Sequence, residues 1–128
     1  AGSALHFGEG FHNKDEIVKN VVIPPSVRFQ EKFHSITMEW REGSIKMFLD
    51  SETEPYLTVQ DNDKAFGEFS YPFDRDYYLI INVAVGGKYD DHKIDRTAFC
   101  LNSKCSNKDN PDDHRFLIDW IEYARLEP

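Results

Sequence analysis

The sequence predicts an all-β fold, arranged as one antiparallel sandwich domain, and three observations support this. Residues 33–40 and 44–50 each alternate apolar and polar side chains on either side of a short turn, which is typical of a hairpin. Residues 78–85 form an almost wholly apolar run, which is typical of a strand buried on both faces. Helical periodicity is nearly absent, so we expect a short turn of helix at most. Short strands separated by turns favour packed antiparallel sheets.

The first 30 residues are expected to hold a short strand, a polar loop and an apolar run. A short strand is predicted around residues 5–7, followed by a polar loop. The apolar residues 21–23 come next, and Pro24-Pro25 stops that run.

Residues 33–50 give the clearest hairpin. Ile36, Met38 and Trp40 alternate with polar residues and so share one face of the first strand. Residues 41–44 make the turn. The returning strand aligns three further apolar residues with that face: Ile45, Met47 and Leu49.

The remaining elements follow from composition. Residues 51–70 are polar and broken by a proline, with a weak strand expected at 56–59. Residues 78–85 form the expected central strand, and 88–115 a long charged loop. Residues 116–126, rich in β-branched and aromatic side chains, form the expected final strand.

Length and charge limit the classes of partner. The 128 residues suit one domain with a substantial core. A net charge of −8 argues against nucleic acid or an anionic membrane as a partner and favours a neutral ligand. No apolar run approaches the roughly 20 residues of a membrane-spanning helix. The first residues lack the form of a signal peptide.

The chain has two cysteines, Cys100 and Cys105, close together in the expected charged loop. Their spacing fits a short-loop disulfide, which would suggest an oxidising compartment, and we expect a secreted protein. Two reduced thiols are the alternative. A zinc site that adds His92 and His114 is disfavoured because paired-ligand spacing is absent.

Asn82 is the one polar residue within the apolar run 78–85. Burying an unpaired amide costs roughly 1–3 kcal/mol. In a buried strand, this side chain would therefore need a partner from the protein or from a ligand.

Four blocks of the chain resemble, in order, the conserved blocks of glycoside hydrolase family 16. This family includes laminarinase-type β-glucanases and β-glucan recognition proteins. The blocks are residues 5–8, 33–50, 72–87 and 116–123. The resemblance implies a jelly-roll sandwich of the concanavalin A-like type. It also implies part of a retaining endo-β-1,3-glucanase that supplies one wall of a groove for β-glucan. A non-catalytic β-1,3-glucan recognition protein is the alternative.

The chain departs from the family at the catalytic strand. That strand carries Glu-x-Asp-x-Glu or Glu-x-Asp-x-x-Glu, and alternation along a strand turns its carboxyls into one cleft. Residues 39–42, 52–54 and 119–122 all fail the pattern. The chain therefore resembles the C-terminal part of the family domain, and no catalytic residue is assigned in it. Half a sandwich would expose an apolar face, so we expect an N-terminal chain or segment to complete the fold.

The resemblance also implies roles for individual residues. Asn82 and His6 match positions that bond sugar hydroxyls, although a structural amide and a structural histidine are the alternatives. Trp40 and Tyr89 are candidates for stacking on a sugar ring, and core packing is the alternative for Trp40. Asp119 matches an aspartate that can ligate a structural calcium ion. The chemistry itself requires no cofactor.

Overall fold

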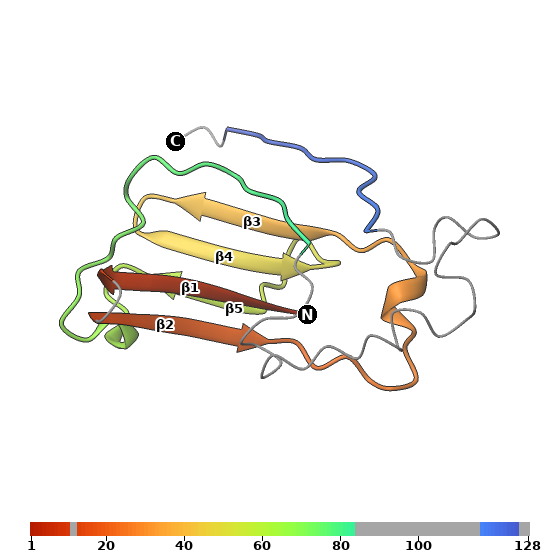
Figure 1. Cartoon of the computed structure of the whole chain (residues 1–128), viewed down its shortest axis with the longest axis horizontal. Helices are drawn as coiled ribbons and strands as arrows, with labels where there is room; N and C mark the ends of the chain where they lie inside the picture. Colours follow the sequence, from red (N-terminus) through yellow and green to blue (C-terminus); the bar gives the residue numbers. More distant parts are fainter. Residues whose placement is uncertain (11–12, 84–115, 126–128) are drawn as a thin grey trace. The chain divides into compact units, whose positions relative to one another are not determined.

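The computed structural model of the chain describes residues 1–10, 13–83 and 116–125. The chain divides into two compact units, Ala1–Tyr77 with Ala124–Pro128, and Tyr78–Tyr123. Every strand and helix of the described residues lies in the first unit (Figure 1).

The first sheet has two antiparallel strands, β1 (Gly2–Glu9) and β2 (Asn13–Asn20). The expectation of a polar loop after the first strand was wrong for β2. Ile17 and Val18 are its only apolar residues, so the strand carries almost no alternating signal. The backbone ladder to β1 holds it instead, with Ile17 opposite Leu5 on the half-buried face.

The second sheet has three antiparallel strands in the order β3-β4-β5, and it confirms the predicted hairpin. They span Ile36–Arg41, Ser44–Leu49 and Leu57–Gln60, so the weak strand expected at 56–59 is also confirmed. Gly43 has φ of +68° in the tight turn between β3 and β4. A residue with a side chain adopts this conformation only at a cost.

One face of this sheet is apolar throughout, but its two ends differ in exposure. Ile45 is 2% exposed, whereas Ile36 and Met38 are 66% and 52% exposed. Cross-strand partners show that eight apolar residues share the face: Ile36, Met38, Trp40, Ile45, Met47, Leu49, Leu57 and Val59.

Helix is confined to two single turns of 3-10 helix within the described residues, as expected from the missing helical periodicity. They are η1 (Phe29–Glu31) and η2 (Lys64–Phe66). The Asp63 side chain accepts a hydrogen bond from the Ala65 amide over 3.0 Å and so caps η2. This cap fixes the turn that points Phe66 into the core.

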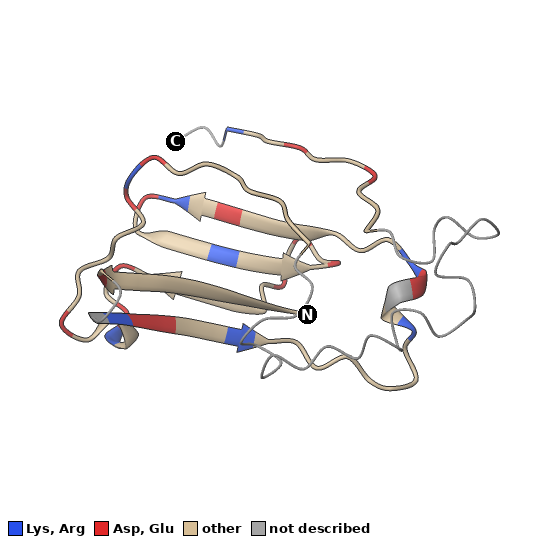
Figure 2. Cartoon of the chain, viewed as in Figure 1, with Lys and Arg blue, Asp and Glu red and all other residues tan. Residues whose placement is uncertain are grey.

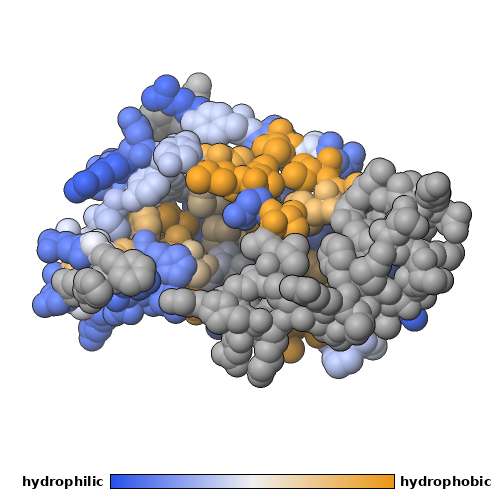
Figure 3. Space-filling model, viewed as in Figure 1, coloured by the Kyte–Doolittle hydropathy of each residue, from blue (hydrophilic) through white to orange (hydrophobic). Residues whose placement is uncertain are grey.

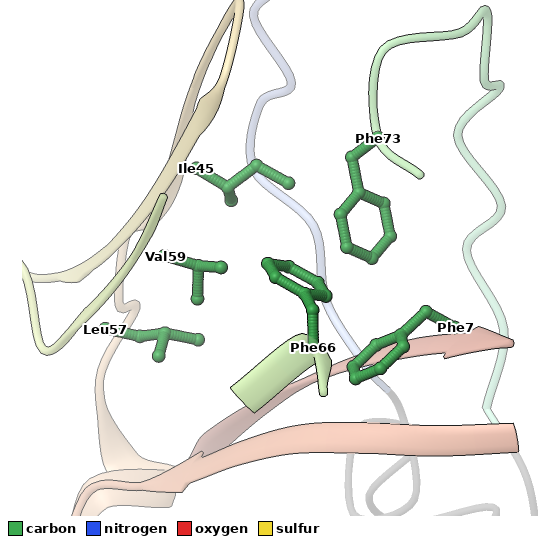
Figure 4. Packing of buried hydrophobic residues seen from close by; sticks show 6 residues of the cluster. All are labelled: Phe7, Ile45, Leu57, Val59, Phe66 and Phe73. Atoms are coloured by element: carbon green, nitrogen blue, oxygen red, sulfur yellow. The ribbon is translucent and has the colours of Figure 1, made fainter. Parts of the chain in front are cut away.

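The core cluster of the first unit draws residues from both sheets. Figure 4 shows the Phe66 ring between the aliphatic side chains of the three-stranded sheet and the Phe7 ring of β1. The Phe66 and Phe7 rings meet edge to face, with centroids 4.9 Å apart. The cluster consists of Phe7, Ile45, Leu57, Val59, Phe66 and Phe73. With antiparallel sheets and almost no helix among the described residues, the prediction of an all-β fold is confirmed.

Two strands predicted from the sequence are absent among the described residues. The described residues 78–83 and 116–125 form no strand, although sequence favoured strands over 78–85 and 116–126. Their apolar side chains are exposed, from 47% for Ile81 to 89% for Tyr123. A strand of continuous apolar residues requires neighbours on both faces, and the described residues do not bury these side chains. Figure 3 shows hydrophobic side chains gathered at the surface. No helix within the described residues has the length and apolar character needed to cross a bilayer.

Candidate functional site

His6 lies on the outer face of β1, opposite Glu16 of β2. Alternation turns its neighbours Leu5 and Phe7 toward the core, while the His6 side chain is 67% exposed. Its Nδ1 atom is 3.0 Å from Oε2 of Glu16. An exposed imidazole beside a carboxylate can both donate and accept hydrogen bonds with a polar ligand.

The other residues of β1 on the same face as His6 are small. Gly2, Ala4 and Gly8 alternate with the inward-pointing residues of the strand. On its own strand, His6 therefore has no large side chain beside it on this face. Glu16 was missed in the sequence because β2 was expected as a loop, and the cross-strand register of a recognised hairpin would have identified it.

Trp40, at the end of β3, is half-buried and packs against the core cluster. Its indole N–H donates to the carbonyl oxygen of Phe73 over 2.8 Å. Its ring meets Tyr77 edge to face at 5.4 Å. These contacts favour the core alternative for Trp40. Because His6 points away from the core that Trp40 packs against, the two side chains do not share one face.

The Tyr71 ring meets the rings of Phe66 and Phe73 edge to face, with centroids 5.6 Å and 5.5 Å away. Its hydroxyl is buried and has no hydrogen-bond partner among the residues that the structure describes. Burial raises the pKa of Tyr71 above its usual value, and the carboxylates of Asp61 and Asp74 add to this effect, whereas the neighbouring Trp40 N–H opposes it. We assign that N–H to the Phe73 carbonyl, so the Tyr71 hydroxyl is a local defect in the packing.

The polar face of the three-stranded sheet carries an acidic residue held between two basic ones. Figure 2 shows charges of both signs on β3 and β4. Glu39 lies 2.8 Å from Arg41 Nε and 3.7 Å from Lys46 Nζ. The hydrogen bond from Arg41 lowers the pKa of Glu39. A carboxyl stabilised in its ionised form is poorly suited to act as a general acid near neutral pH.

Two other predicted site residues belong to the second unit. Asn82 is exposed within 78–83, so its amide has no burial cost to offset and the argument that it needs a partner was wrong. Asp119 is exposed within 116–125. The described residues contain no group of three or more His, Cys, Asp or Glu side chains that could hold a metal ion. Three predicted residues lie outside the described residues: Tyr89, Cys100 and Cys105.

Comparison with known proteins finds similarity to two glucan-hydrolysing enzymes. The chain is 30% identical over 87 residues to a glucan endo-1,3-beta-glucosidase of Cryptopygus antarcticus. This match covers 66% of the chain and 32% of the relative. The chain is also 30% identical over 88 residues to glucan endo-1,3-beta-glucosidase A1 of Niallia circulans. This second match covers 67% of the chain and 13% of the relative.

A third relative is a binding protein by name. The chain is 29% identical over 102 residues to a beta-1,3-glucan-binding protein of Penaeus monodon, which covers 67% of the chain and 27% of the relative. The chain therefore spans about a third or less of the length of these relatives. No family model and no solved structure matches the chain.

Proposed function

We propose that this chain is part of a carbohydrate-active β-sandwich that acts on β-1,3-glucan. In this proposal it is the C-terminal part of a jelly-roll domain of glycoside hydrolase family 16. It supplies one wall of a glucan-binding groove in a retaining, laminarinase-like endo-β-1,3-glucanase. The observation that carries the proposal is the similarity, over about two thirds of the chain, to two glucan endo-1,3-beta-glucosidases and a beta-1,3-glucan-binding protein.

His6 is the described residue best suited to bind a sugar. It is exposed, its small neighbours leave it accessible, and Glu16 beside it adds a second hydrogen-bonding group. Sugar hydroxyls are both donors and acceptors, so an imidazole and a carboxylate together can engage one sugar through both kinds of hydrogen bond. Asn82 and Tyr89 remain proposed sugar contacts on the family resemblance. Trp40 remains a proposed stacking residue, limited to whatever ring face its core contacts leave accessible.

A non-catalytic β-1,3-glucan recognition protein is the second candidate. Whether carboxylates occupy the strand upstream of the matched family blocks is what would distinguish it from the enzyme. One relative is itself named as a glucan-binding protein. Both candidates require glucan binding, and they differ in turnover.

Binding is tested by affinity electrophoresis of the purified chain in gels that contain laminarin, with cellulose as the control polysaccharide. Laminarin should slow migration, and His6→Ala should weaken this effect by about tenfold, the loss of one well-placed polar contact. Thr58→Ala is the matched control, because Thr58 is exposed on the polar face of the other sheet. Unchanged migration of a folded chain in laminarin would overturn the proposal.

Turnover separates the two candidates. The 128 residues by themselves should release no reducing ends from laminarin, because they lack the catalytic pattern. When a longer protein with the upstream strand is assayed, reducing ends support the enzyme, whereas binding without turnover supports the recognition protein.

Four further features belong to the same proposal. They are a β-glucan partner with an N-terminal segment that completes the sandwich, a structural calcium ion near Asp119, a Cys100–Cys105 disulfide, and secretion. The relatives are much longer than the matched region, which supports a larger domain. A single carboxylate is a weak calcium site, so Asp119 would require backbone oxygens as additional ligands.

A further inference from the structure

His34 lies between η1 and the end of β4, and both of its ring nitrogens face an oxygen. Nδ1 is 2.6 Å from Oδ2 of Asp50, and Nε2 is 2.8 Å from the carbonyl oxygen of Phe29. The ring stacks on the Phe29 ring with centroids 3.7 Å apart and planes inclined by 8°. The His34 side chain is 16% exposed, whereas the Asp50 side chain is 47% exposed.

The number of ring protons follows from the two partners. A peptide carbonyl oxygen can only accept a hydrogen bond, and so can an ionised carboxylate. The hydrogen bond with His34 lowers the pKa of Asp50. The Ser35 amide, which donates to Oδ1 over 2.9 Å, lowers it further. Asp50 therefore acts as an ionised acceptor. A neutral imidazole has one N–H and would leave a lone pair facing one of these oxygens. Both contacts are satisfied when both nitrogens carry a proton.

The other charged groups near His34 leave Asp50 as its only ionic partner among the described residues. Arg28, which precedes η1, and Glu31 of η1 pair with each other over 2.6 Å, and both are exposed. On the β3 side the neighbouring residue is the uncharged Ser35, whose carbonyl oxygen accepts from the Asp50 amide over 3.0 Å.

The His34 ring forms a hydrogen-bonded link between η1 and the end of β4. The other hydrogen bonds described for residues 24–34 run within that segment: Val27 to Pro24, Phe29 to Val27, and Glu31 to Arg28. The segment reaches β4 through the bond between His34 and Asp50. Loss of one ring proton must therefore break the link to the carboxylate or the link to the Phe29 carbonyl.

We propose that His34 is a proton-dependent clamp that ties η1 to the end of β4 while its ring is doubly protonated and releases η1 when one proton is lost. The device is independent of the proposed glucan function. Histidine is the side chain suited to such a change near physiological pH. The clamp closes toward acid and opens toward alkaline pH, because protonation supplies the second donor.

Two measurements on the unmodified chain test the clamp. Nitrogen-15 spectra at about pH 6 should show both ring nitrogens of His34 protonated, with the exposed His6 ring as an internal reference. Hydrogen exchange of residues 26–33, corrected for intrinsic rates, should lose about tenfold protection or more between about pH 6 and pH 9. A single ring proton at the acid end, or protection that does not change with pH, would overturn the proposal.

Matched variants separate the clamp from general electrostatics. Asp50→Asn removes the ionic acceptor and should move the loss of protection toward acid. Glu31→Gln also removes one negative charge, but Glu31 pairs with Arg28 and not with the ring, so it should leave the transition in place. If both variants shift the transition equally, the pH dependence comes from net charge and not from the contact with the ring, which would contradict the clamp. His34→Gln should make the exchange of this segment independent of pH over the same range.

Discussion

Phe66 offers the most direct test of how the two sheets are joined. Its side chain is 3% exposed and contacts Phe7, Tyr71 and Phe73. Removing a buried aromatic ring to alanine costs about 3–5 kcal/mol, which combines lost burial with the cavity that remains. Because the ring lies between the sheets and makes three aromatic contacts, we expect a value near the middle, about 4 kcal/mol for Phe66→Ala. Phe66→Leu retains most of the volume and should cost about 1.5 kcal/mol.

Urea unfolding followed by circular dichroism and tryptophan fluorescence measures both values, since Trp40 packs against the same cluster. Phe33→Ala is the matched control, because Phe33 is the same residue type but is 65% exposed. It should change the unfolding free energy by no more than about 0.5 kcal/mol. If Phe66→Ala and Phe33→Ala shift the urea midpoint equally, the ring does not join the sheets as described. Phe66→Leu keeps the comparison measurable if the alanine variant does not fold.

Three further predictions follow from particular contacts. Asp50 should make the free energy of unfolding roughly 1 kcal/mol larger than in Asp50→Asn, the value of a charge-assisted bond at a half-exposed carboxylate. This difference should be present above the pKa of the carboxyl in the unfolded chain, about 4. It should disappear as pH falls through the lower folded pKa, which urea unfolding at a series of pH values would show. Tyr71→Phe should leave the melting temperature unchanged or raise it, since it removes a buried hydroxyl without a partner, and a clear decrease would reveal a partner. Gly43→Ala should cost about 1–2 kcal/mol in urea unfolding, because its φ is +68° and the new Cβ would lie 3.0 Å from Oδ2 of Asp61. A neutral result would show that the turn relaxes.

The sequence predicts the β3–β4 hairpin well because its signals are local. Alternating apolar residues and a glycine turn act within a dozen residues, and the register follows from them. β2 is not predicted from the sequence because its few apolar residues show no alternation with polar ones. Its hydrogen-bond ladder to β1 stabilises it instead. Residues 78–83 fail in the opposite way. Their composition favours a buried strand, but burial depends on neighbours that composition cannot supply.

In the candidate site, too, local features can be predicted from the sequence, whereas contacts that depend on the fold cannot. A single polar residue such as His6 can be selected from a strand pattern, but its partner Glu16 emerges only from the strand register. The contacts of His34 are even harder to predict from the sequence. They depend on residues 5 and 16 positions away, which converge on one ring only after the hairpin and η1 have formed.

The exposed run at residues 78–83 has a consequence for how the chain behaves in concentrated solution. It is a six-residue window of high β-propensity with no charge and no proline, the composition that stacks into intermolecular cross-β structure when left uncovered. The exposed triplet Asp74-Arg75-Asp76 comes shortly before it, and Asp119 interrupts the second apolar run. Charges at such positions act as gatekeepers against self-association. Asp119 can therefore be valuable for keeping the chain soluble, whether or not a metal ever binds there.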